Sequence, residues 1–204
     1  MIRVVLTGGG LGGKSTLGRE LITGTYLSRR WVVVPEIADV ILQSGISAAN
    51  QEFEVALVSL QIATEEVLGT LGKATDVLLC HRGSLDPLAF WLRKGWSEDD
   101  FFARTATSRQ RHYDRYHAVI HLESTAIGAS EVYKASPRAE PIEQAKLLDL
   151  LCERAWGGHP HYGKVQNSSG IWAEKKEKAL NLLAKSLSMP AGERFQVRRG
   201  NECL

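Results

Sequence analysis

Five glycines lie within the eight residues from Gly8 to Ser15, which read Gly-Gly-Gly-Leu-Gly-Gly-Lys-Ser and directly follow an apolar run at residues 2–6. This is the P-loop pattern, in which two glycines bracket four residues and are followed by Lys and Ser. Without side chains in the way, the backbone can bend around an anion and point many N–H groups at it. The helix that begins near Lys14 directs its positive end at the same anion. The pattern therefore predicts a site for nucleotide phosphates.

The last residues of the loop have separate predicted roles. Lys14 is expected to reach the β- and γ-phosphates of ATP, and the hydroxyl of Ser15 is expected to be a ligand of Mg²⁺. Thr16 is the less favoured metal ligand. ATP and Mg²⁺ are thus the expected cofactors. The predicted nucleotide site in this loop consists of Gly8, Gly9, Gly10, Leu11, Gly12, Gly13, Lys14, Ser15 and Thr16.

The same glycines also fit a second motif. Gly8, Gly10 and Gly13 match the G-x-G-x-x-G pattern of dinucleotide-binding folds. Glu36 stands about where the ribose-binding acid of those folds is expected. The second motif does not require a cation after its last glycine, whereas a P-loop needs both Lys14 and a hydroxyl. Both are present here, so the P-loop is favoured and a dinucleotide site is the alternative.

Length, charge and cysteine content restrict the protein class. We expect a single domain at residues 1–188 and a flexible tail at residues 189–204, because 204 residues suffice for one α/β core. The formal charge of +2 is too balanced to indicate a nucleic-acid or membrane surface. Cys80, Cys152 and Cys203 are widely spaced and odd in number, which favours reduced thiols in a cytoplasmic protein. We expect neither a secretion signal nor a membrane span, since no apolar run is long enough.

Apolar, β-branched runs that alternate with helical patterns predict an α/β fold. We expect an open, parallel five-stranded sheet flanked by helices, of the P-loop NTPase class. The longest helical segment has one face that is expected to pack into the core, and its residues at helical spacing are Phe53, Leu57, Leu60, Thr64, Val67, Leu68 and Leu71. The predicted strands cover residues 2–6, 31–34, 75–80, 118–122 and 163–165.

Polar side chains follow each predicted strand. Because ligands bind outside the carboxyl ends of parallel strands, these side chains are the candidates for chemistry. Glu36 follows the second strand, and residues 81–86 follow the third. Residues 123–124 follow the fourth strand, and residues 167–169 follow the fifth. We expect all of them to converge near the P-loop.

Arg82 and Asp86 are the charged candidates after the third strand. A guanidinium presents five donors in a planar fork, which suits phosphate or developing phosphoryl charge. Arg82 could instead form an ion pair with Glu36 or Asp86, and the two roles are compatible. Asp86 could hold Mg²⁺ through water or bind substrate hydroxyls, but Ser84 and Asp86 before Pro87 also look like an ordinary helix start. The sequence leaves these alternatives open.

Three further stretches combine with the P-loop to give a family resemblance. They read Val-Val-Pro-Glu-Ile-Ala at residues 33–38, His-Arg-Gly-Ser-Leu-Asp-Pro-Leu-Ala-Phe at 81–90, and Ser-Pro-Arg-Ala-Glu at 136–140. Over roughly its first four-fifths the chain resembles the predicted-ATPase (AAA-domain) branch of the P-loop kinases that includes the ribosylnicotinamide kinase domain. It resembles the deoxynucleoside and thymidylate kinases more distantly. The resemblance implies a kinase-type strand order and phosphoryl transfer from ATP to a small acceptor.

The resemblance also assigns individual residues. It places the carboxylate of Glu36 beside the acceptor hydroxyl, where it could accept or orient the proton, although an acid there could instead favour the helix dipole. It places Arg138 on a lid at residues 124–140 that closes over the triphosphate, with Lys134 as a weaker second and a solvated surface arginine as the alternative. By analogy, Asn167 lies where such kinases contact adenine.

One position departs from the family pattern. The family has Asp-Arg-Gly where this chain has His81-Arg82-Gly83, so the acid at the strand end is missing and a metal role at position 81 is in doubt. Asp86 matches the second acid of the family. The aromatic group after it could stack on a planar acceptor, but a place in the core is at least as fitting. This group consists of Phe90, Trp91, Trp96, Phe101 and Phe102.

The predicted function is ATP-dependent phosphoryl transfer to a small acceptor such as a nucleoside or riboside. The main alternative is an NTPase switch that acts on a protein partner without a small acceptor, and a dinucleotide-binding module is the third. The expected partners are the nucleotide and the acceptor, with no membrane and no nucleic acid. The predicted catalytic residues are Lys14, Glu36, Arg82, Asp86 and Arg138, and the predicted metal ligands are Ser15 and Asp86.

Overall fold

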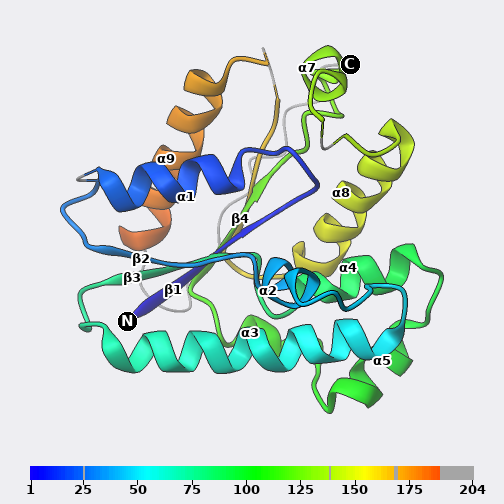
Figure 1. Ribbon diagram of the computed structural model, residues 1–204. Helices are drawn as coiled ribbons and strands as arrows, with labels where there is room; N and C mark the ends of the chain where they lie inside the picture. Colours follow the sequence, from blue (N-terminus) through cyan, green and yellow to red (C-terminus); the bar gives the residue numbers. More distant parts are fainter. Residues whose placement is uncertain (25, 138, 168–169, 189–204) are drawn as a thin grey trace, which may run out of the picture.

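The five predicted strands form one open sheet in which all neighbouring strands are parallel (Figure 1). The structure, a computed structural model, describes residues 1–24, 26–137, 139–167 and 170–188. The predicted α/β fold with an open parallel sheet is therefore confirmed. The strands are β1 (Ile2–Thr7), β2 (Trp31–Val34), β3 (Val77–His81), β4 (Ala118–Leu122) and β5 (Tyr162–Val165), in the spatial order β2-β3-β1-β4-β5.

The strand order distinguishes the two motifs that the glycines match. In the dinucleotide-binding fold, the second strand of the chain lies beside the first. Here β3 lies beside β1, with Val5 next to Cys80, and β2 forms the edge of the sheet. The arrangement agrees with the order expected for a P-loop kinase and not with the order that a dinucleotide-binding module requires.

The third strand begins at Val77, two residues later than the sequence pattern indicated, and ends with His81. Asp76 explains the later start, because its side chain accepts hydrogen bonds from Arg30 and from the backbone of the preceding turn. These bonds hold Asp76 in the turn rather than in the strand. At the other end His81 pairs with Leu6 of β1, so the sheet itself positions the histidine.

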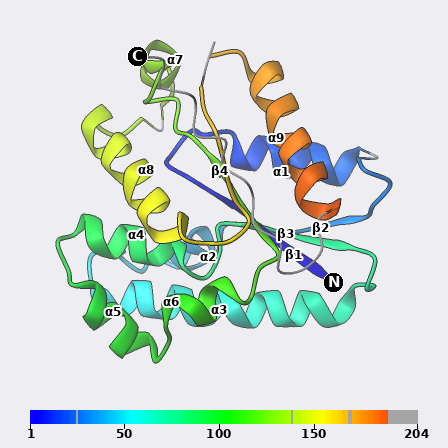
Figure 2. The same ribbon diagram turned by 180° about the vertical axis from the view of Figure 1, so that it is seen from behind.

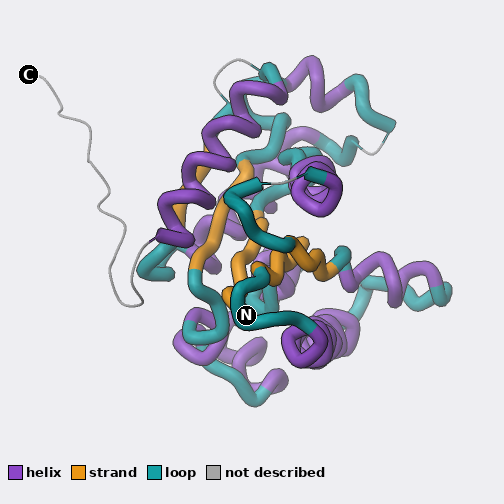
Figure 3. The backbone as a smooth tube through the Cα atoms, turned by 90° about the vertical axis from the view of Figure 1, so that its left-hand side faces the viewer, coloured by secondary structure: helices purple, strands orange, loops and turns teal. Residues whose placement is uncertain are grey.

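Helices cover both faces of the sheet, as Figures 1 and 2 show from opposite sides. On one face, α1 (Lys14–Thr23) and α9 (Trp172–Ser188) pack against strand residues such as Leu6 and Ile120. On the other face α3 (Gln51–Leu71) lies along the sheet, and the tube in Figure 3 shows the strands between these layers. The remaining helices are α2 (Ile37–Gln43), α4 (Asp86–Arg93), α5 (Glu98–Thr105), α6 (Arg109–Tyr113), α7 (Ser130–Lys134) and α8 (Ile142–Trp156).

Helix α3 buries only part of the predicted face. Phe53 and Leu57 are buried as expected and Leu68 is partly buried, but Leu60, Val67 and Leu71 are exposed. Gln61 and Glu65 are buried in their place. The prediction was wrong for the exposed leucines and valine because it counted apolar residues alone, whereas α3 turns two polar side chains inward to meet a buried hydrogen-bond network.

Three further predictions concern the C-terminal tail, membrane-spanning helices and the cysteines. The predicted tail, residues 189–204, lies outside the described residues, and the domain boundary at residue 188 stays a prediction. Within the described residues, no helix is long and apolar enough to cross a lipid bilayer. Cys80 and Cys152 are both buried with free thiols, and Cys203 lies outside the described part of the chain.

Candidate functional site

The P-loop turns sharply between the end of β1 and the start of α1. Gly8 and Gly13 have φ angles of +115° and +94°, in the region that favours glycine. A Cβ atom on Gly8 or Gly12 would lie 2.3 Å or 2.4 Å from the carbonyl oxygen of Leu122, at the end of β4. Glycine is therefore required both by the backbone conformation and by the close packing of the loop on the sheet.

The N-terminus of α1 is open to an anion. Gly13 is its N-cap residue, and among the described residues no side chain caps it and its first turn holds no acid. In contrast, the side chain of Asn50 caps α3 by accepting a hydrogen bond from the N–H of Phe53. The first N–H groups of α1 and its positive dipole end thus fit a phosphate group.

Lys14 points back into the P-loop. Its Nζ donates to the carbonyl oxygens of Gly8 at 3.0 Å and Gly9 at 2.6 Å. Burial, aided by the charge of Arg82, lowers the pKa of Lys14 to about 8. Neutral carbonyls are weak partners for a buried ammonium group, and a phosphate would be a stronger one. The residues present therefore fit a nucleotide triphosphate.

Ser15 and His81 meet at the start of α1. Oγ of Ser15 is hydrogen-bonded to Nε2 of His81 at 2.9 Å, and Nδ1 of His81 lies 3.5 Å from Oε2 of Glu36. Burial lowers the pKa of His81 to about 4, so the ring is neutral at pH 7 and its contact with Glu36 is not an ion pair. Within the described residues, no three His, Cys, Asp or Glu side chains form a group that could hold a metal. The donor set fits Mg²⁺, which keeps several waters and is carried largely by substrate phosphates.

Arg82 joins three parts of the site. Its Nε donates to Oε1 of Glu36 at 2.7 Å, and its Nη1 donates to the carbonyl of Gly8 at 3.2 Å and to Oδ1 of Asp86 at 3.3 Å. Both ion pairs considered from the sequence are thus present. Burial disfavours the charged form, but the charges of Glu36 and Asp86 outweigh it and raise the pKa of Arg82 above its ordinary value. The guanidinium therefore stays protonated beside the P-loop.

Glu36 is the N-cap residue of α2, yet its side chain makes no capping hydrogen bond. Burial opposes ionisation of Glu36, but the charge of Arg82 and the hydrogen bond that Arg82 donates lower the pKa of Glu36 to about 2. The side chain of Glu36 is 29% exposed, so one edge of the carboxylate remains accessible. The group is an ionised hydrogen-bond acceptor near the P-loop.

Asp86 is the first residue of α4 and is almost fully buried. Oδ1 accepts hydrogen bonds from Oγ1 of Thr7 at 2.7 Å and from Arg82. Oδ2 accepts from the N–H of Gly83 at 2.8 Å and from Nε1 of Trp156 at 3.0 Å. Both oxygens are therefore occupied by protein donors, so the carboxylate links β1, α8 and the turn before α4.

A cavity of about 290 Å³ opens beside Arg82 between α2, α3 and α4. Glu36 and Asp86 line it, so the structure brings the three predicted acceptor residues to one cavity. Of the predicted aromatic group, Phe90 lines the cavity, whereas Trp91 and Phe101 are completely buried in the core. The apolar part of the wall includes Ile37, Leu42, Phe53, Leu57, Pro87 and Phe90.

A second cavity of about 110 Å³ lies against the other side of the P-loop, beside Gly12 and Gly13. Asn167 and Trp172 line this cavity. The side-chain amide of Asn167 donates to the backbone carbonyl of Ser124 at 2.6 Å, so part of its hydrogen-bonding capacity holds the segment after β4. The placement leaves Asn167 at the wall of a pocket next to the phosphate loop.

The predicted lid at residues 124–140 contains the short helix α7. Lys134 lies on its surface, paired with Glu131 at 2.8 Å, and its side chain is 56% exposed. Tyr133 is buried and ties the segment down, since its hydroxyl accepts a hydrogen bond from the N–H of Glu140. Arg138 lies outside the described residues, so its role as a lid cation stays a prediction.

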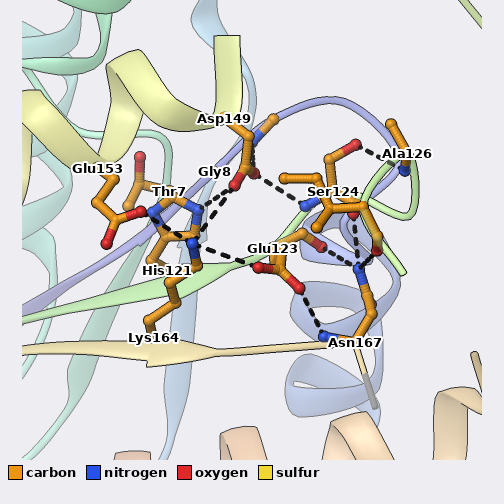
Figure 4. Close-up of polar contacts among 12 residues, drawn as sticks. Thr7, Gly8, His121, Glu123, Ser124, Ala126, Asp149, Glu153, Lys164 and Asn167 are labelled. Atoms are coloured by element: carbon orange, nitrogen blue, oxygen red, sulfur yellow. Dashed lines mark hydrogen bonds and ion pairs between the residues drawn. The ribbon is translucent and has the colours of Figure 1, made fainter. Parts of the chain in front are cut away.

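Asp149, on α8, is a site residue that sequence reasoning missed (Figure 4). Its Oδ1 accepts from the N–H of Gly9 at 2.8 Å and from the N–H of Ser124 at 2.9 Å. Its Oδ2 is hydrogen-bonded to Nε2 of His121 at 3.0 Å. One buried carboxylate therefore ties the P-loop to the start of the lid segment. The available signal was an acid between Leu148 and Leu151 on an otherwise apolar helix face, which does not reveal the partner.

Sequence reasoning also missed a buried hydrogen-bond network that reaches the backbone of Arg82. Nε2 of Gln61 donates to the backbone carbonyl of Arg82 at 3.1 Å and to Oε1 of Glu65 at 2.8 Å. The hydroxyl of Tyr116 donates to Glu65 at 2.6 Å and accepts from the N–H of Ser84 at 2.7 Å. These bonds support the turn in which Arg82 adopts a φ of +70°, an uncommon conformation for a residue with a side chain.

Comparisons with known proteins agree with this geometry. A family model described as an AAA domain matches residues 3–175. No curated protein matches the sequence. Among solved structures, deoxyadenosine kinase from M. mycoides is similar with a TM-score of 0.57 and 14% identity, over 91% of this chain and 98% of that one. The NadR protein in complex with NR is similar with a TM-score of 0.67 and 13% identity, over 93% of this chain. The chain spans about half of the length of NadR, 51%, and at these identities the likeness concerns the fold.

Proposed function

The chain belongs to the AAA-domain family, and on that premise we propose that it is an ATP-dependent kinase for a small acceptor that carries a hydroxyl group. The resemblance to the P-loop kinases is confirmed in family and in fold. The activity and the roles of the site residues are our proposal. The observation that carries it is the cavity whose wall holds the Glu36 carboxylate and Arg82, because Arg82 also donates a hydrogen bond to Gly8 of the P-loop.

The phosphate side of the proposed site uses the P-loop. The N–H groups at the start of α1 and the ammonium group of Lys14 would bind the triphosphate, and Lys14 would exchange its carbonyl partners for phosphate oxygens. Ser15 would be the protein ligand of Mg²⁺, whose charge neutralises the phosphates when it is bound. The base of the nucleotide would occupy the smaller cavity between Asn167 and Trp172.

Glu36 and Arg82 carry the proposed acceptor chemistry. A carboxylate with a pKa of about 2 is a weak base, so Glu36 is suited to orient the acceptor hydroxyl by accepting its hydrogen bond. Phosphoryl transfer has a loose transition state that demands positioning more than early proton removal. Arg82 lies between this carboxylate and the P-loop, where its fork would stabilise the charge of the transferring group.

Asp86 has a different role in this proposal from the one first expected. Its oxygens already accept four hydrogen bonds from protein donors, among them Thr7 and Trp156. We assign it to positioning Arg82 and the start of α4 and not to Mg²⁺. We keep Arg138 as the proposed lid cation, in preference to Lys134, which already has a carboxylate partner on the surface.

The charges of the cavity favour an uncharged acceptor. Among the described residues that line it, each cation already has a carboxylate partner. Arg82 is paired with Glu36 and Asp86, and the other pairs are Arg93 with Glu140 at 2.7 Å and Lys94 with Glu54 at 2.9 Å. The charge of each cation is thus already compensated, which gives an anionic acceptor such as a nucleoside monophosphate little net attraction. A nucleoside or riboside needs no such attraction.

The test is direct product analysis. Purified protein is incubated with Mg²⁺, ATP labelled in the γ-phosphate, and a panel of nucleosides, ribosides and nucleoside monophosphates, and products are followed by mass spectrometry. We expect label in one or more nucleosides or ribosides and none in the monophosphates. The kinase proposal fails if nothing in a broad metabolite extract is phosphorylated while a protein partner stimulates ATP hydrolysis, the result expected for a switch NTPase.

A further inference from the structure

The cavity beside Arg82, where we place the acceptor, has in its wall a buried carboxylate oxygen without a hydrogen-bond partner. Glu54, on α3, lines the cavity and is 2% exposed. Its Oε1 accepts a hydrogen bond from Nζ of Lys94 at 2.9 Å, whereas its Oε2 has no hydrogen-bond partner in the described part of the protein. Buried polar atoms are nearly always paired, so an exception in the wall of a cavity points to a group that a ligand supplies.

Lys94 is not available to satisfy both oxygens. Its Nζ also donates to the backbone carbonyl of Ala48 and lies 4.8 Å from the centre of the Trp96 ring. The ammonium group is thus held on three sides and contacts one edge of the carboxylate. Burial raises the pKa of Glu54, although the hydrogen bond and the charge of Lys94 oppose this rise.

Helix α4 sets the distance between this carboxylate and the proposed reaction centre. Asp86 begins the helix beside Arg82, and Lys94 is its C-cap residue beside Glu54. At 1.5 Å per residue the two ends are about 12 Å apart along the helix axis. Phe90 lies between them in the cavity wall, with the guanidinium groups of Arg82 and Arg93 at 5.0 Å and 5.2 Å from its ring centre. The cavity therefore has two polar ends and an aromatic middle.

We propose that Oε2 of Glu54 accepts a hydrogen bond from an amino, amide or ring N–H group of the acceptor, so that Glu54 selects planar heterocyclic rings that carry such a donor. The acceptor hydroxyl would lie at Glu36 and the ring beside Phe90. Rings without the N–H group leave Oε2 unpaired, and rings with a carboxylate at that position are repelled. The inference rests on the proposed kinase function and adds the chemistry of the ring.

Matched pairs of acceptors test the inference in the intact wild-type protein. Suitable pairs are adenosine and purine riboside, cytidine and pyrimidinone riboside, and nicotinamide riboside and nicotinic acid riboside. Each pair differs at the donor group. For the pair whose donor-bearing member reacts best, we expect kcat/KM to fall about tenfold or more when the N–H donor is absent.

The variant Glu54→Gln removes the charge but keeps the shape of the side chain. We expect it to bind Mg·ATP as the wild type does and to lose most of the discrimination within the pair. Glu52→Gln is the control, because Glu52 is on the same helix, 69% exposed and paired with Arg104 on the surface, and its discrimination should not change.

The outcomes separate the two proposals. If no acceptor is phosphorylated, the kinase function fails. If acceptors are phosphorylated but the wild type treats both members of each pair alike, Glu54 does not select for N–H groups and the inference is overturned while the kinase function stands. The same conclusion holds if Glu54→Gln retains full discrimination. Should that variant fail to fold, the ratios of kcat/KM that the wild type gives within each pair still test whether the N–H donor is selected.

Discussion

The hydroxyl of Ser15 lies 2.9 Å from Nε2 of His81, so the predicted Mg²⁺ ligand contacts the residue that stands where the family pattern has an acid. A neutral imidazole gives this edge of the site one negative charge fewer than an aspartate would. Glu36, whose Oε2 lies 3.5 Å from Nδ1 of His81, is the nearby carboxylate. Replacing the neutral imidazole at position 81 by a carboxylate should therefore change how strongly Mg²⁺ is bound.

We expect His81→Asp to lower the Mg²⁺ concentration that gives half-maximal ATP turnover by about three- to tenfold, because a carboxylate would attract the cation beside Ser15. Magnesium titrations at fixed, saturating ATP measure it. His81→Asn is the matched control, since it removes the ring without adding charge and should not lower the Mg²⁺ requirement. An equal effect of both variants would show that charge at this position is not the cause.

Lys14→Ala should abolish or severely weaken binding of Mg·ATP without unfolding the protein. The substitution removes a buried ammonium group whose partners are the carbonyls of Gly8 and Gly9, but it removes nothing from the apolar core. Isothermal titration calorimetry with Mg·ATP and a thermal unfolding curve give the two readouts. Lys146→Ala is the control, because Lys146 is a surface residue paired with Glu143. Unchanged affinity in the Lys14 variant would refute the P-loop assignment.

Glu36→Gln should cut phosphoryl transfer by about 10²-fold and leave Mg·ATP binding almost intact, because the neutral amide orients the acceptor hydroxyl less well. Arg82→Lys should behave in the same direction, since it keeps the charge but loses the planar fork. Background ATP hydrolysis should change much less than transfer in both variants. If transfer survives in both, the kinase class stands but this placement of its active site is wrong.

The low pKa of Glu36 predicts how the stability of the folded protein depends on pH. Arg82 lowers this pKa from an ordinary value of 4.5 to about 2, so the folded state holds the ionised form more firmly than the unfolded state does. The stabilisation is therefore fully present above pH 4.5 and is lost as the pH falls towards 2. Urea unfolding at pH 7, 5, 4 and 3 measures the free energy of unfolding. We expect the difference in this free energy between the wild type and Glu36→Gln to shrink below pH 4.5. For Glu143→Gln, an exposed control, we expect no comparable change.

Asp149→Ala should destabilise the protein by about 2–5 kcal/mol and weaken Mg·ATP binding, because it leaves the buried N–H groups of Gly9 and Ser124 unpaired. Asp149→Asn retains an acceptor oxygen and should have a smaller effect on both. Urea denaturation and calorimetry measure the two quantities. If Asp149→Ala loses stability but binds Mg·ATP with wild-type affinity, Asp149 supports the fold and does not shape the P-loop.

The sequence by itself determined the elements whose signals are local. The glycine-rich run at residues 8–13 predicts a phosphate loop, and Gly8, Gly12 and Gly13 indeed leave no room for a side chain. The strands at residues 31–34 and 118–122 lie where the apolar runs predict them. The convergence of Glu36, Arg82 and Asp86 could also be predicted, since parallel strands end at one edge of the sheet.

Only the tertiary structure decided which side chains meet across the fold. Gly9 and Asp149 are 140 residues apart, and the oxygens of Asp86 are occupied by donors from β1 and α8 as well as from their own turn. Periodicity and motif spacing describe the backbone near one residue, whereas a buried hydrogen bond depends on how distant helices pack. For the same reason, the unpaired oxygen of Glu54 could be seen only in the cavity that α3 and α4 enclose together.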